Sequence, residues 1–174
     1  MCNSSETGAH IFYSFDNIDR YIQNACTFIS ESIRNQQPVL LLENDRLFPL
    51  IYKELKYKWS NEELDKLSHI NNFDFYCSNG EFHPQTMVRY FFNKIKPLRD
   101  GNIPIRTWAH VEWGIQEEIT KLIMEFEELA DPSVSNMNLV SVCAYDSSEL
   151  TGLMKRSLLK SHGYYMTDTQ IVPC

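Results

Sequence analysis

The sequence predicts an α/β fold in which a mostly parallel sheet of five or six strands has helices on both faces. Short apolar runs alternate with longer segments whose apolar residues recur every three or four positions, an alternation typical of strand–helix units. The chain has 174 residues, 43% of them hydrophobic, so one domain can bury an ordinary core. No internal repeat or interdomain linker interrupts the pattern. We therefore treat residues 1–174 as one domain with a loose tail at residues 1–8.

Three strand–helix units are predicted in the first half of the chain. The strands are short and apolar, as expected where both faces of a sheet are covered: His10–Phe15, Pro38–Glu43 and Phe73–Cys77. The helices that follow each have one apolar face: Ile18–Ile33, about Asp45–Trp59, and Pro84–Ile95. Asp16 can cap the first helix, and Pro84 suits the first position of the third. Residues 61–68 are predicted to form a short helix or an irregular turn.

The second half of the chain repeats the pattern twice and adds a last strand. The predicted strands are a segment from Ile103 onward, Leu139–Tyr145, and Tyr164–Val172, the last antiparallel at the sheet edge. One helix is expected from Gly114 to about Asp131–Pro132. Another follows Asp146-Ser-Ser-Glu149, which resembles a capping box, and ends before Gly163, where a C-terminal glycine belongs.

The charge balance excludes one class of partner. The formal net charge is −7 at pH 7, and the isoelectric point is near 5.2. Binding to a phosphate backbone depends on clustered Lys and Arg. The one basic cluster, Lys53, Lys56 and Lys58, is short and flanked by Glu54 and Glu62. We expect a solvated helix face there and no direct binding of nucleic acid.

The sequence also indicates a soluble, cytoplasmic protein that does not enter a membrane. The N-terminus lacks the basic start and apolar core of a signal peptide, and the longest apolar runs are far shorter than a membrane span. The five cysteines are odd in number and include no CxxC pair, so neither a disulfide framework nor a zinc knuckle is expected. Cys26 and Cys143 fall in apolar runs, where we expect small buried side chains.

Nucleotide-binding and hydrolase motifs are absent from the sequence. The turn after the first predicted strand, Tyr13–Ile18, contains no glycine, although nucleotide-binding α/β domains cradle phosphate there with glycine backbone amides. The second such turn, Glu43–Arg46, has none either, and no GxGxxG, P-loop or GxSxG sequence occurs. These absences count against ATPase, dehydrogenase and α/β-hydrolase functions, and we expect no cofactor.

The leading candidate for a binding site is the segment Ile103–Gly114, which is predicted to leave a strand and enter a helix. Trp108, His110, Glu112 and Trp113 place two aromatic rings, an imidazole and a carboxylate at this junction. Ligands of alternating α/β proteins bind beyond the carboxyl ends of strands. The alternative interpretation is a core Trp pair with one buried, hydrogen-bonded Glu.

Other strand ends are predicted to contribute to the same site. The sheet would bring together aromatic and acidic residues from four junctions: Tyr13 and Asp16, Glu43 and Asp45, Trp108 to Trp113, and Tyr145 and Asp146. A crevice of this composition suits a small apolar or cationic ligand better than an anionic one. Asp16 and Asp146 also have a structural interpretation as helix N-caps.

Four residues could form a metal or redox site if the last strand returns beside the first: His10, Cys143, His162 and Cys174. No local ligand spacing supports such a site, so we predict no bound metal, and Cys143 and His162 are the candidates that remain. The same two residues could form a nucleophile pair, but Cys143 falls within a strand and not at a helix N-terminus, where thiols are activated. His162 is expected in the last turn of its helix, where the dipole favours a partly cationic ring.

Several features in a fixed order resemble one known family. They are His10 with Tyr13 before the first helix, Pro38–Leu42, Arg106 with Glu112-Trp113, Phe126-Glu127, Cys143-Ala-Tyr-Asp146, and His162 before Ile171-Val-Pro173. The chain resembles the MEDS domain, a sensory domain named from regulators of methanogens and methylotrophs. The Cys-x-Tyr-Asp segment and the downstream His162 are the most specific of these features.

The resemblance implies a sensing or protein-interaction module without enzymatic activity. The family's fold is similar to that of RecA/KaiC-type ATPases without their P-loop, in agreement with the glycine-free first turn. Relatives are often joined to a DNA-binding domain or a histidine-kinase-like ATPase domain, and this sequence has neither. It also has Arg34–Gln37 where the family usually has a glycine. A stand-alone sensor is expected to signal by binding another protein.

Two functional hypotheses follow. In the first, a cytoplasmic regulatory module binds a small molecule or a signalling protein, such as a kinase, an anti-sigma factor or a transcription regulator, without catalysis. Its expected binding residues are Tyr13, Arg106, Trp108, His110, Glu112, Trp113, Tyr145 and Asp146. In the second, the chain is an enzyme, either a degenerate nucleotide-binding protein or a thiol-dependent one that uses Cys143 and His162. A homo-oligomer that pairs through an aromatic edge strand near Tyr164-Tyr165 is a further expectation.

Overall fold

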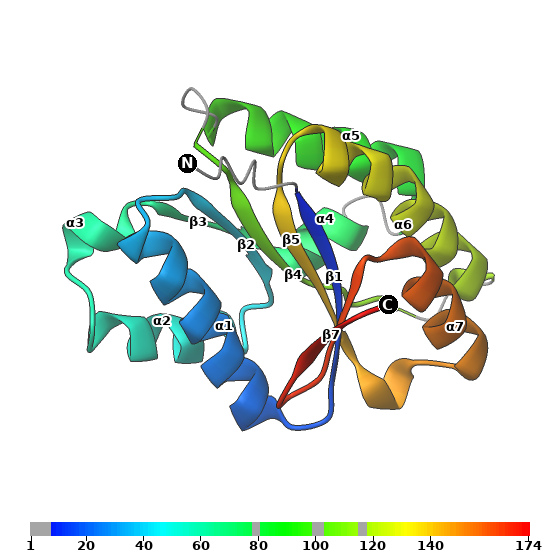
Figure 1. Ribbon diagram of the computed structural model, residues 1–174, viewed down its shortest axis with the longest axis horizontal. Coiled ribbons are helices and arrows are strands. Elements are labelled where there is room, and N and C mark those ends of the chain that lie inside the picture. Colours follow the sequence, from blue (N-terminus) through cyan, green and yellow to red (C-terminus); the bar gives the residue numbers. More distant parts are fainter. Residues whose placement is uncertain (1–7, 78–80, 99–102, 115–117) are drawn as a thin grey trace, which may run out of the picture.

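In a computed structural model that describes residues 8–77, 81–98, 103–114 and 118–174, the chain forms one seven-stranded sheet (Figure 1). The strands are β1 (Ala9–Phe15), β2 (Val39–Glu43), β3 (Leu67–Asn71), β4 (Arg106–His110), β5 (Val140–Asp146), β6 (Tyr164–Met166) and β7 (Ile171–Pro173). Their order across the sheet is β3-β2-β4-β5-β1-β6-β7. Every neighbouring pair is parallel except β6 and β7, which form an antiparallel hairpin. The predicted α/β fold with a mostly parallel sheet is confirmed.

Helices cover both faces of the sheet, as the sequence predicts (Figure 1). One face carries α1 (Ile18–Arg34), α2 (Phe48–Lys56) and α3 (Asn61–Leu64). The other carries α4 (Asn72–Cys77), α5 (Pro84–Ile95), α6 (Ile119–Asn136) and α7 (Gly152–Ser161). Short 3-10 turns are formed by Lys96–Leu98 and Ser147–Glu149. No helix in the described ranges combines the length and the hydropathy that crossing a bilayer requires.

Two apolar layers pack between the sheet and its helices. Alternate residues of a strand point to opposite faces, so on β1 Phe12 lies in the layer of α4–α7 and Tyr13 in the layer of α1–α3. On β5, Val142 belongs to the α1 layer and Cys143 to the α6 layer. The burial of these apolar side chains is the main term that stabilises the layered arrangement. The same alternation decides which candidate site residues can meet.

The third predicted strand, Phe73–Cys77, is wrong, because its residues form α4. The strand that joins β2 is β3, in a segment predicted as a short helix or turn. β3 pairs with β2 alone at one edge of the sheet and is half-buried along its length, so it lacks the apolar run of a central strand. The Asn71 side-chain oxygen accepts the backbone N–H groups of Phe73 and Asp74 at 2.9 and 3.3 Å, which favours a helix at that point.

The last predicted strand, Tyr164–Val172, is a hairpin instead of a single strand. β6 pairs with β1 on one side and β7 on the other, so Tyr164 and Tyr165 do not lie on an edge strand. The edge on this side is β7, whose residues Ile171–Pro173 are all exposed. The premise that an edge strand near Tyr164 forms an oligomer contact is therefore corrected.

The boundaries of two other elements differ from the predictions. α6 continues through Pro132, where the sequence predicts its end. Val134 beyond the proline is buried in the core, and this contact offsets the helical hydrogen bond that proline removes. The predicted start of that helix, after Gly114, falls on residues 115–117, which lie outside the described ranges. β4 begins at Arg106, three residues later than the predicted strand.

The capping predictions are wrong for the helices at both junctions, although Asp146 does cap a turn. Asp146 caps the 3-10 turn Ser147–Glu149 through a hydrogen bond from a backbone N–H to its side-chain oxygen, while α7 has a separate cap in Thr151. At the first junction the cap of α1 is Asn17 and not Asp16, because the Asn17 side chain accepts a backbone N–H of the first helical turn.

Candidate functional site

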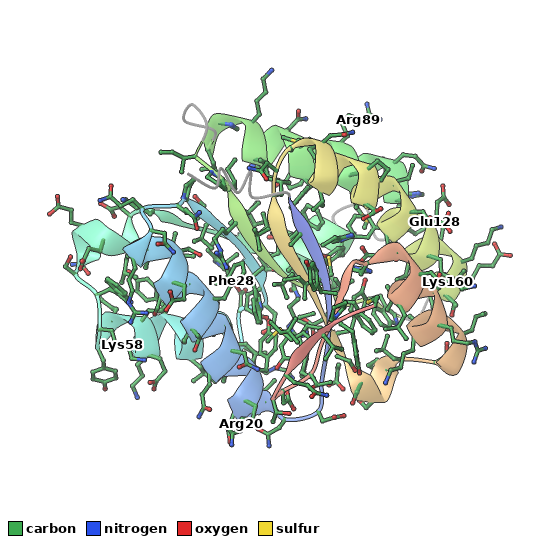
Figure 2. The ribbon with its side chains drawn as sticks, in the orientation of Figure 1. Arg20, Phe28, Lys58, Arg89, Glu128 and Lys160 are labelled. Atoms are coloured by element: carbon green, nitrogen blue, oxygen red, sulfur yellow. The ribbon has the colours of Figure 1, made fainter. Side chains whose placement is uncertain are left out.

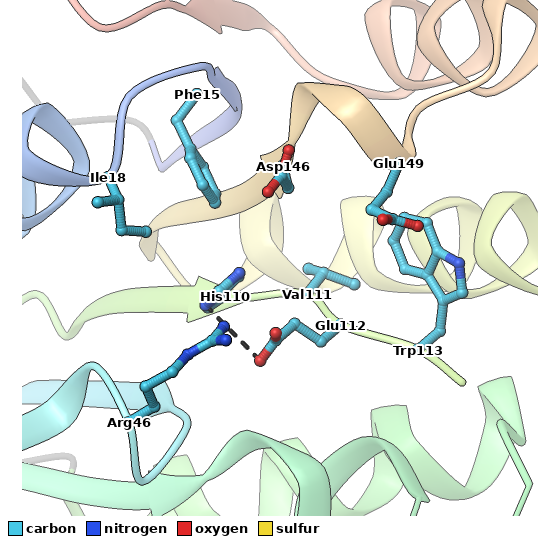
Figure 3. A pocket seen from close by; sticks show the side chains of 9 residues that line it. All are labelled: Phe15, Ile18, Arg46, His110, Val111, Glu112, Trp113, Asp146 and Glu149. Carbon is cyan, nitrogen blue, oxygen red and sulfur yellow. Dashed lines mark ion pairs between the residues drawn. The ribbon is translucent and has the colours of Figure 1, made fainter. Parts of the chain in front are cut away.

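A pocket opens at the end of the sheet where the strands have their carboxyl ends (Figure 3). Its volume is about 270 Å³, near the lower limit for small-molecule sites. It is lined by residues from the ends of β1, β4 and β5, the start of α1 and the segment after β2: Phe15, Ile18, Arg46, His110, Val111, Glu112, Trp113, Asp146 and Glu149. Ligands of parallel α/β sheets bind at this end of the sheet, so the pocket is the candidate site.

A buried carboxylate lies beneath the pocket. Glu43, the last residue of β2, is fully buried, and both of its oxygens have donors. Oε2 accepts the Tyr21 hydroxyl, which also accepts the Trp108 indole N–H at 2.9 Å. Oε1 accepts the Asn44 backbone N–H at 2.9 Å and the Nδ1–H of His110 at 2.8 Å, and the second ring nitrogen of His110 points into the pocket (Figure 3). These bonds offset the cost of burying the charge.

Glu112 places a fixed negative charge at the side of the pocket. Its Oε2 accepts the side-chain amides of Asn44 and Asn72, each at 2.7 Å, and lies 3.8 Å from His110 Nδ1. Partial burial acts to raise the pKa of this carboxyl, but the His110 ring and the two amides outweigh burial and hold the pKa below its usual value. Glu112 is therefore ionised at neutral pH and held in one orientation.

The pocket as a whole is negative and partly aromatic. Three carboxylates line it, Glu112, Asp146 and Glu149, together with one guanidinium, that of Arg46. Figure 3 shows Arg46 next to Glu112, with Asp146 and Glu149 across the cavity. Trp113 contributes a half-buried ring to the wall. This composition suits a cation or a neutral hydrogen-bond donor better than an anion.

Four of the eight binding residues expected from sequence line the pocket: His110, Glu112, Trp113 and Asp146. All of them lie at or just beyond the ends of β4 and β5, as the rule on strand ends predicts. Asp146 lines the pocket and caps a turn at the same time, because Oδ1 accepts the Ser148 N–H at 2.9 Å. The alternative interpretation of a core Trp pair holds for one ring only, since Trp113 is half-buried.

The structure does not bring the other four expected residues into the pocket: Tyr13, Arg106, Trp108 and Tyr145. Tyr13 and Trp108 are buried in the α1 layer, and Tyr145 is buried in the α6 layer. Arg106 lies at the amino end of β4, where its guanidinium carbon is 4.4 Å from the centre of the Phe28 ring. Because side chains alternate along a strand, residues that are close in sequence are separated by the sheet.

A carboxylate from the other end of the chain binds the turn between β1 and α1. Asp168, in the β6–β7 hairpin, accepts the backbone N–H groups of Asp16 and Asn17 through Oδ2, at 3.1 and 3.0 Å. Its Oδ1 accepts the Tyr13 hydroxyl at 2.6 Å. Backbone amides at a helix N-terminus form a general anion-binding position. The chain therefore supplies its own anion at a position where nucleotide-binding α/β domains in general hold phosphate.

Cys143 and His162 lie together in the α6 layer, beside His10 and Glu127. Cys174 is exposed and does not belong to this group. Burial and the charge of Glu127 raise the pKa of the Cys143 thiol to about 11, so this thiol is protonated at neutral pH and a poor nucleophile. Burial lowers the pKa of His162 to about 4. The ring is neutral at pH 7, which corrects the expectation of a partly cationic imidazole.

The family model of the MEDS domain, the methanogen/methylotroph, DcmR sensory domain, matches residues 9–163 of the chain. The chain belongs to the MEDS family. It is thus a member of a family of sensory domains, and the match covers every residue that lines the pocket. The match ends before β6, so the hairpin that carries Asp168 lies beyond the matched region of this MEDS domain. No curated protein matches the sequence.

Solved structures similar to this MEDS domain share its fold. A KaiC-like protein from the hyperthermophilic archaeon Pyrococcus horikoshii OT3 superposes with a TM-score of 0.61 at 11% sequence identity, over 92% of this chain and 71% of that protein. The flagellar accessory protein FlaH from Methanocaldococcus jannaschii gives a TM-score of 0.53 at 12% identity, also over 92% of this chain and 71% of that protein. At these identities the similarity concerns the fold alone, and it confirms the expected KaiC-like architecture.

Several residues that build the site are not evident from the sequence: Tyr21, Asn44, Arg46, Asn72 and Asp168. Asn72 has a usable signal, because adjacent asparagines before a helix indicate a cap at a strand end. Asn44 and Arg46 lie in a turn that the sequence marks only by its lack of glycine. Asp168 has no local signal, since its backbone partners are 151 and 152 positions away along the chain.

Proposed function

We propose that this MEDS domain is a sensor that binds a small cationic ligand in the pocket and does not convert it chemically. One observation carries the proposal: three carboxylates and a single guanidinium surround a cavity with an aromatic wall. The charge balance gives the class of ligand, and the cavity volume restricts it to a small molecule.

Glu112 gives the proposal its most direct support. Its carboxylate is held by Asn44 and Asn72, so a cation would meet a charge that is already oriented. Trp113 lies on the same segment, and its ring would attract a cation placed over its face. His110, whose Nδ1 is hydrogen-bonded to Glu43, directs its second ring nitrogen toward the cavity.

Two features support binding without catalysis. The carboxylate of Asp168 already takes the amides at the start of α1, so a nucleotide phosphate would have to displace it. The Cys143 thiol is buried and protonated, and thus unsuited to nucleophilic attack. His110 and Glu43 are the pair that an enzyme would use as general base and orienting group, so turnover needs a direct test.

We further propose that a cytoplasmic signalling protein, such as a kinase, an anti-sigma factor or a transcription regulator, reads the bound state. Ile18 opens α1 at the pocket, and Arg46 lies in the short segment that leads to α2. A ligand would therefore contact the start of α1 and the segment that leads to α2, and both helices have faces at the surface. A shift of these helices would be visible to a partner that docks on them. The sensory character of the MEDS family supports this role.

The test compares three probes with the same trimethyl body and different charge: trimethylammonium, tert-butanol and pivalate. We expect isothermal titration to give the tightest binding for trimethylammonium, at least about tenfold tighter than tert-butanol, or about 1.4 kcal/mol. Pivalate should give no binding heat, because the carboxylates repel it. The probe should be recovered unchanged, as judged by proton NMR after prolonged incubation.

Matched variants locate the binding. Glu112→Gln should weaken trimethylammonium binding, whereas Glu128→Gln, which removes an exposed carboxylate from α6 (Figure 2), should not. Equal affinity for pivalate, or binding that survives Glu112→Gln, would contradict a cation site in this pocket. A chemical product that disappears in His110→Gln would identify an enzyme instead.

A further inference from the structure

A second group of polar side chains is buried on the face of the sheet that α4–α7 cover. His10 lies on β1, Glu127 on α6, Cys143 on β5, and His162 at the end of α7. Each is at most 5% exposed, and one ligand atom from each lies within 4.8 Å of all the others. We call these four residues the buried tetrad. None of them lines the pocket, and the proposed sensing does not use them.

Three distances within the buried tetrad match those between the ligands of one metal ion. Glu127 Oε2 lies 3.4 Å from His10 Nε2 and 3.5 Å from His162 Nε2. Cys143 Sγ lies 3.4 Å from His10 Nε2. Zinc binds nitrogen, oxygen and sulfur at about 2.0–2.3 Å, so neighbouring ligands of a tetrahedral site are separated by roughly 3.3–3.7 Å. All three separations fall in that interval.

The outer hydrogen bonds of the two imidazoles turn both Nε2 atoms toward the centre of the tetrad. His162 Nδ1 lies 2.8 Å from the Leu158 carbonyl oxygen, a contact that requires the ring proton on that nitrogen. His10 Nδ1 faces the Asp131 carboxylate at 3.2 Å and is likewise a donor. His162 Nε2 therefore directs a lone pair at Glu127 Oε2, which is itself an acceptor.

The consequence is a set of buried acceptors that lack donors. Glu127 Oε2 and His162 Nε2 have no hydrogen-bond partner in the part of the chain that the structure describes, although buried polar atoms are almost always paired. A proton on His10 Nε2 could be donated to Glu127 Oε2 or to Cys143 Sγ, but it would leave His162 Nε2 without a hydrogen-bond donor. A metal ion accepts an electron pair from all four side chains at once.

The surroundings of the tetrad hold its ligand atoms in place. The Asp131 carboxylate and the Leu158 carbonyl fix the outer nitrogen of each imidazole, and the second oxygen of Glu127 accepts the Tyr145 hydroxyl. Such outer partners orient the ligands of natural metal sites and strengthen their binding.

We propose that the buried tetrad is a structural zinc site in which His10, Glu127, Cys143 and His162 are the four ligands. Two imidazoles with one thiolate favour zinc over magnesium or calcium, which prefer oxygen. A zinc ion with one thiolate and one carboxylate is electrically neutral, so the site can be buried without a counterion. Four protein ligands leave no position for water, and this makes the role structural. The proposal reverses the expectation from sequence that the chain holds no metal.

The site would connect four elements that are far apart in the chain. It would join the end of α7 and the middle of α6 to the central strands β1 and β5. Binding requires the Cys143 thiol to lose its proton to solvent, and the energy of the metal–ligand bonds would become part of the folding energy.

The experiment uses the full chain, stripped of metal by a chelator and then titrated with Co²⁺. We expect one Co²⁺ per chain, with the visible bands of tetrahedral cobalt and the near-ultraviolet band of a thiolate bound to cobalt. Zn²⁺ should remove both by displacement. X-ray absorption of the zinc-loaded chain should give one sulfur and three nitrogen or oxygen neighbours.

Variants assign the ligands. Cys143→Ser should abolish the thiolate band. His162→Gln should weaken Co²⁺ binding at least about tenfold, because even the loss of a residue that only hydrogen-bonds to a metal ligand weakens metal binding by that factor. Cys174→Ser, which alters the exposed cysteine, should change neither. A folded wild-type chain that binds no Co²⁺, or a thiolate band that persists in Cys143→Ser, would overturn the proposal. The X-ray absorption measurement uses the wild-type chain, so it still tests the site if the Cys143→Ser chain fails to fold. A zinc ion with no sulfur neighbour would also overturn the proposal.

Discussion

The pocket and the buried tetrad combine the same residue types with opposite results. Beneath the pocket, both oxygens of Glu43 receive hydrogens, and His110 donates to one of them. In the tetrad, one oxygen of Glu127 receives a hydroxyl, while the other lies close to two imidazole nitrogens and has no hydrogen bond within the described residues. The pairing of each oxygen, and not the identity of the side chain, separates a self-sufficient network from a candidate set of metal ligands.

The sharpest test of this contrast replaces each carboxylate by its amide in the metal-free chain. Glu43→Gln should lower the free energy of unfolding by about 3 kcal/mol, because an amide nitrogen would face a donor and a charged hydrogen bond is lost. Glu127→Gln should cost less than about 1 kcal/mol, since the oxygen that it replaces has no donor. Urea unfolding measures both.

Zinc should reverse that order. Zinc binding should raise the free energy of unfolding of the wild-type chain far more than that of the Glu127→Gln chain. The Glu43→Gln chain should show the same zinc-dependent increase as the wild type. Glu128→Gln on the surface of α6 is the control and should stay within about 0.5 kcal/mol of wild type in both states. If Glu43→Gln and Glu127→Gln lose the same free energy of unfolding without metal, Glu127 Oε2 already receives a hydrogen bond from one of the imidazoles.

Two tryptophans test how firmly the network beneath the pocket is supported. Trp108 is 1% exposed and donates to Tyr21, which in turn donates to Glu43. Trp108→Phe should lower the free energy of unfolding by about 2 kcal/mol through the lost hydrogen bond and volume. Trp113→Phe, in the half-buried wall, should cost less than about 0.5 kcal/mol. If both variants lose a similar free energy of unfolding, measured by heat or urea, the two rings contribute to the core to the same extent.

A smaller effect is expected from the hairpin that closes the first turn. Asp168→Asn keeps the shape of the side chain but removes the charge from three hydrogen bonds, to Tyr13 and to the amides of Asp16 and Asn17. We expect a loss of about 1 kcal/mol in the free energy of unfolding. Phosphate should then stabilise the variant more than wild type in a thermal shift. If phosphate stabilises the variant no more than the wild type, groups other than this carboxylate also keep phosphate away from the two amides.

The smallest effect concerns the pH dependence of Glu112. Its pKa lies below the usual value in the folded chain, so its contribution to stability is present above the unfolded pKa of about 4.3 and is lost as pH falls through the folded value. Because the side chain is 39% exposed, the contribution should stay below about 1 kcal/mol. The difference between wild type and Glu112→Gln should be constant from pH 7 to about 5 and shrink below 4. A difference that grows on acidification would contradict this sign.

The central strands were predictable because their apolar runs are long and uninterrupted, as in β2 and β5. β3 was not, because an edge strand needs only half-burial and Leu-Ser-His-Ile-Asn has no regular alternation. The aromatic content of Phe73–Cys77 favoured a strand, but a side-chain cap from Asn71 outweighed that local propensity.

The site residues that could be predicted from the sequence are those that lie at the ends of strands. The end of β4 places His110 and Glu112 at the pocket, and the end of β5 places Asp146 there. The face of the sheet toward which Tyr13 and Trp108 point depends on strand parity, which their identities do not reveal. The tetrad could not be predicted from the sequence because its residues come from four separate elements, and the identity of Glu127 as a fourth member depends on the packing of α6.

The strand order also dictates when the protein can fold during its synthesis. β1 is synthesised before the other strands of this sheet, yet its sheet neighbours are β5 and β6. His10 and Cys143, which meet across β1 and β5, are 133 positions apart. At about 5–20 residues per second, the nascent β1 waits roughly seven to twenty-seven seconds for its first partner strand. Throughout that interval an apolar, aromatic strand remains available to chaperones and to other nascent chains.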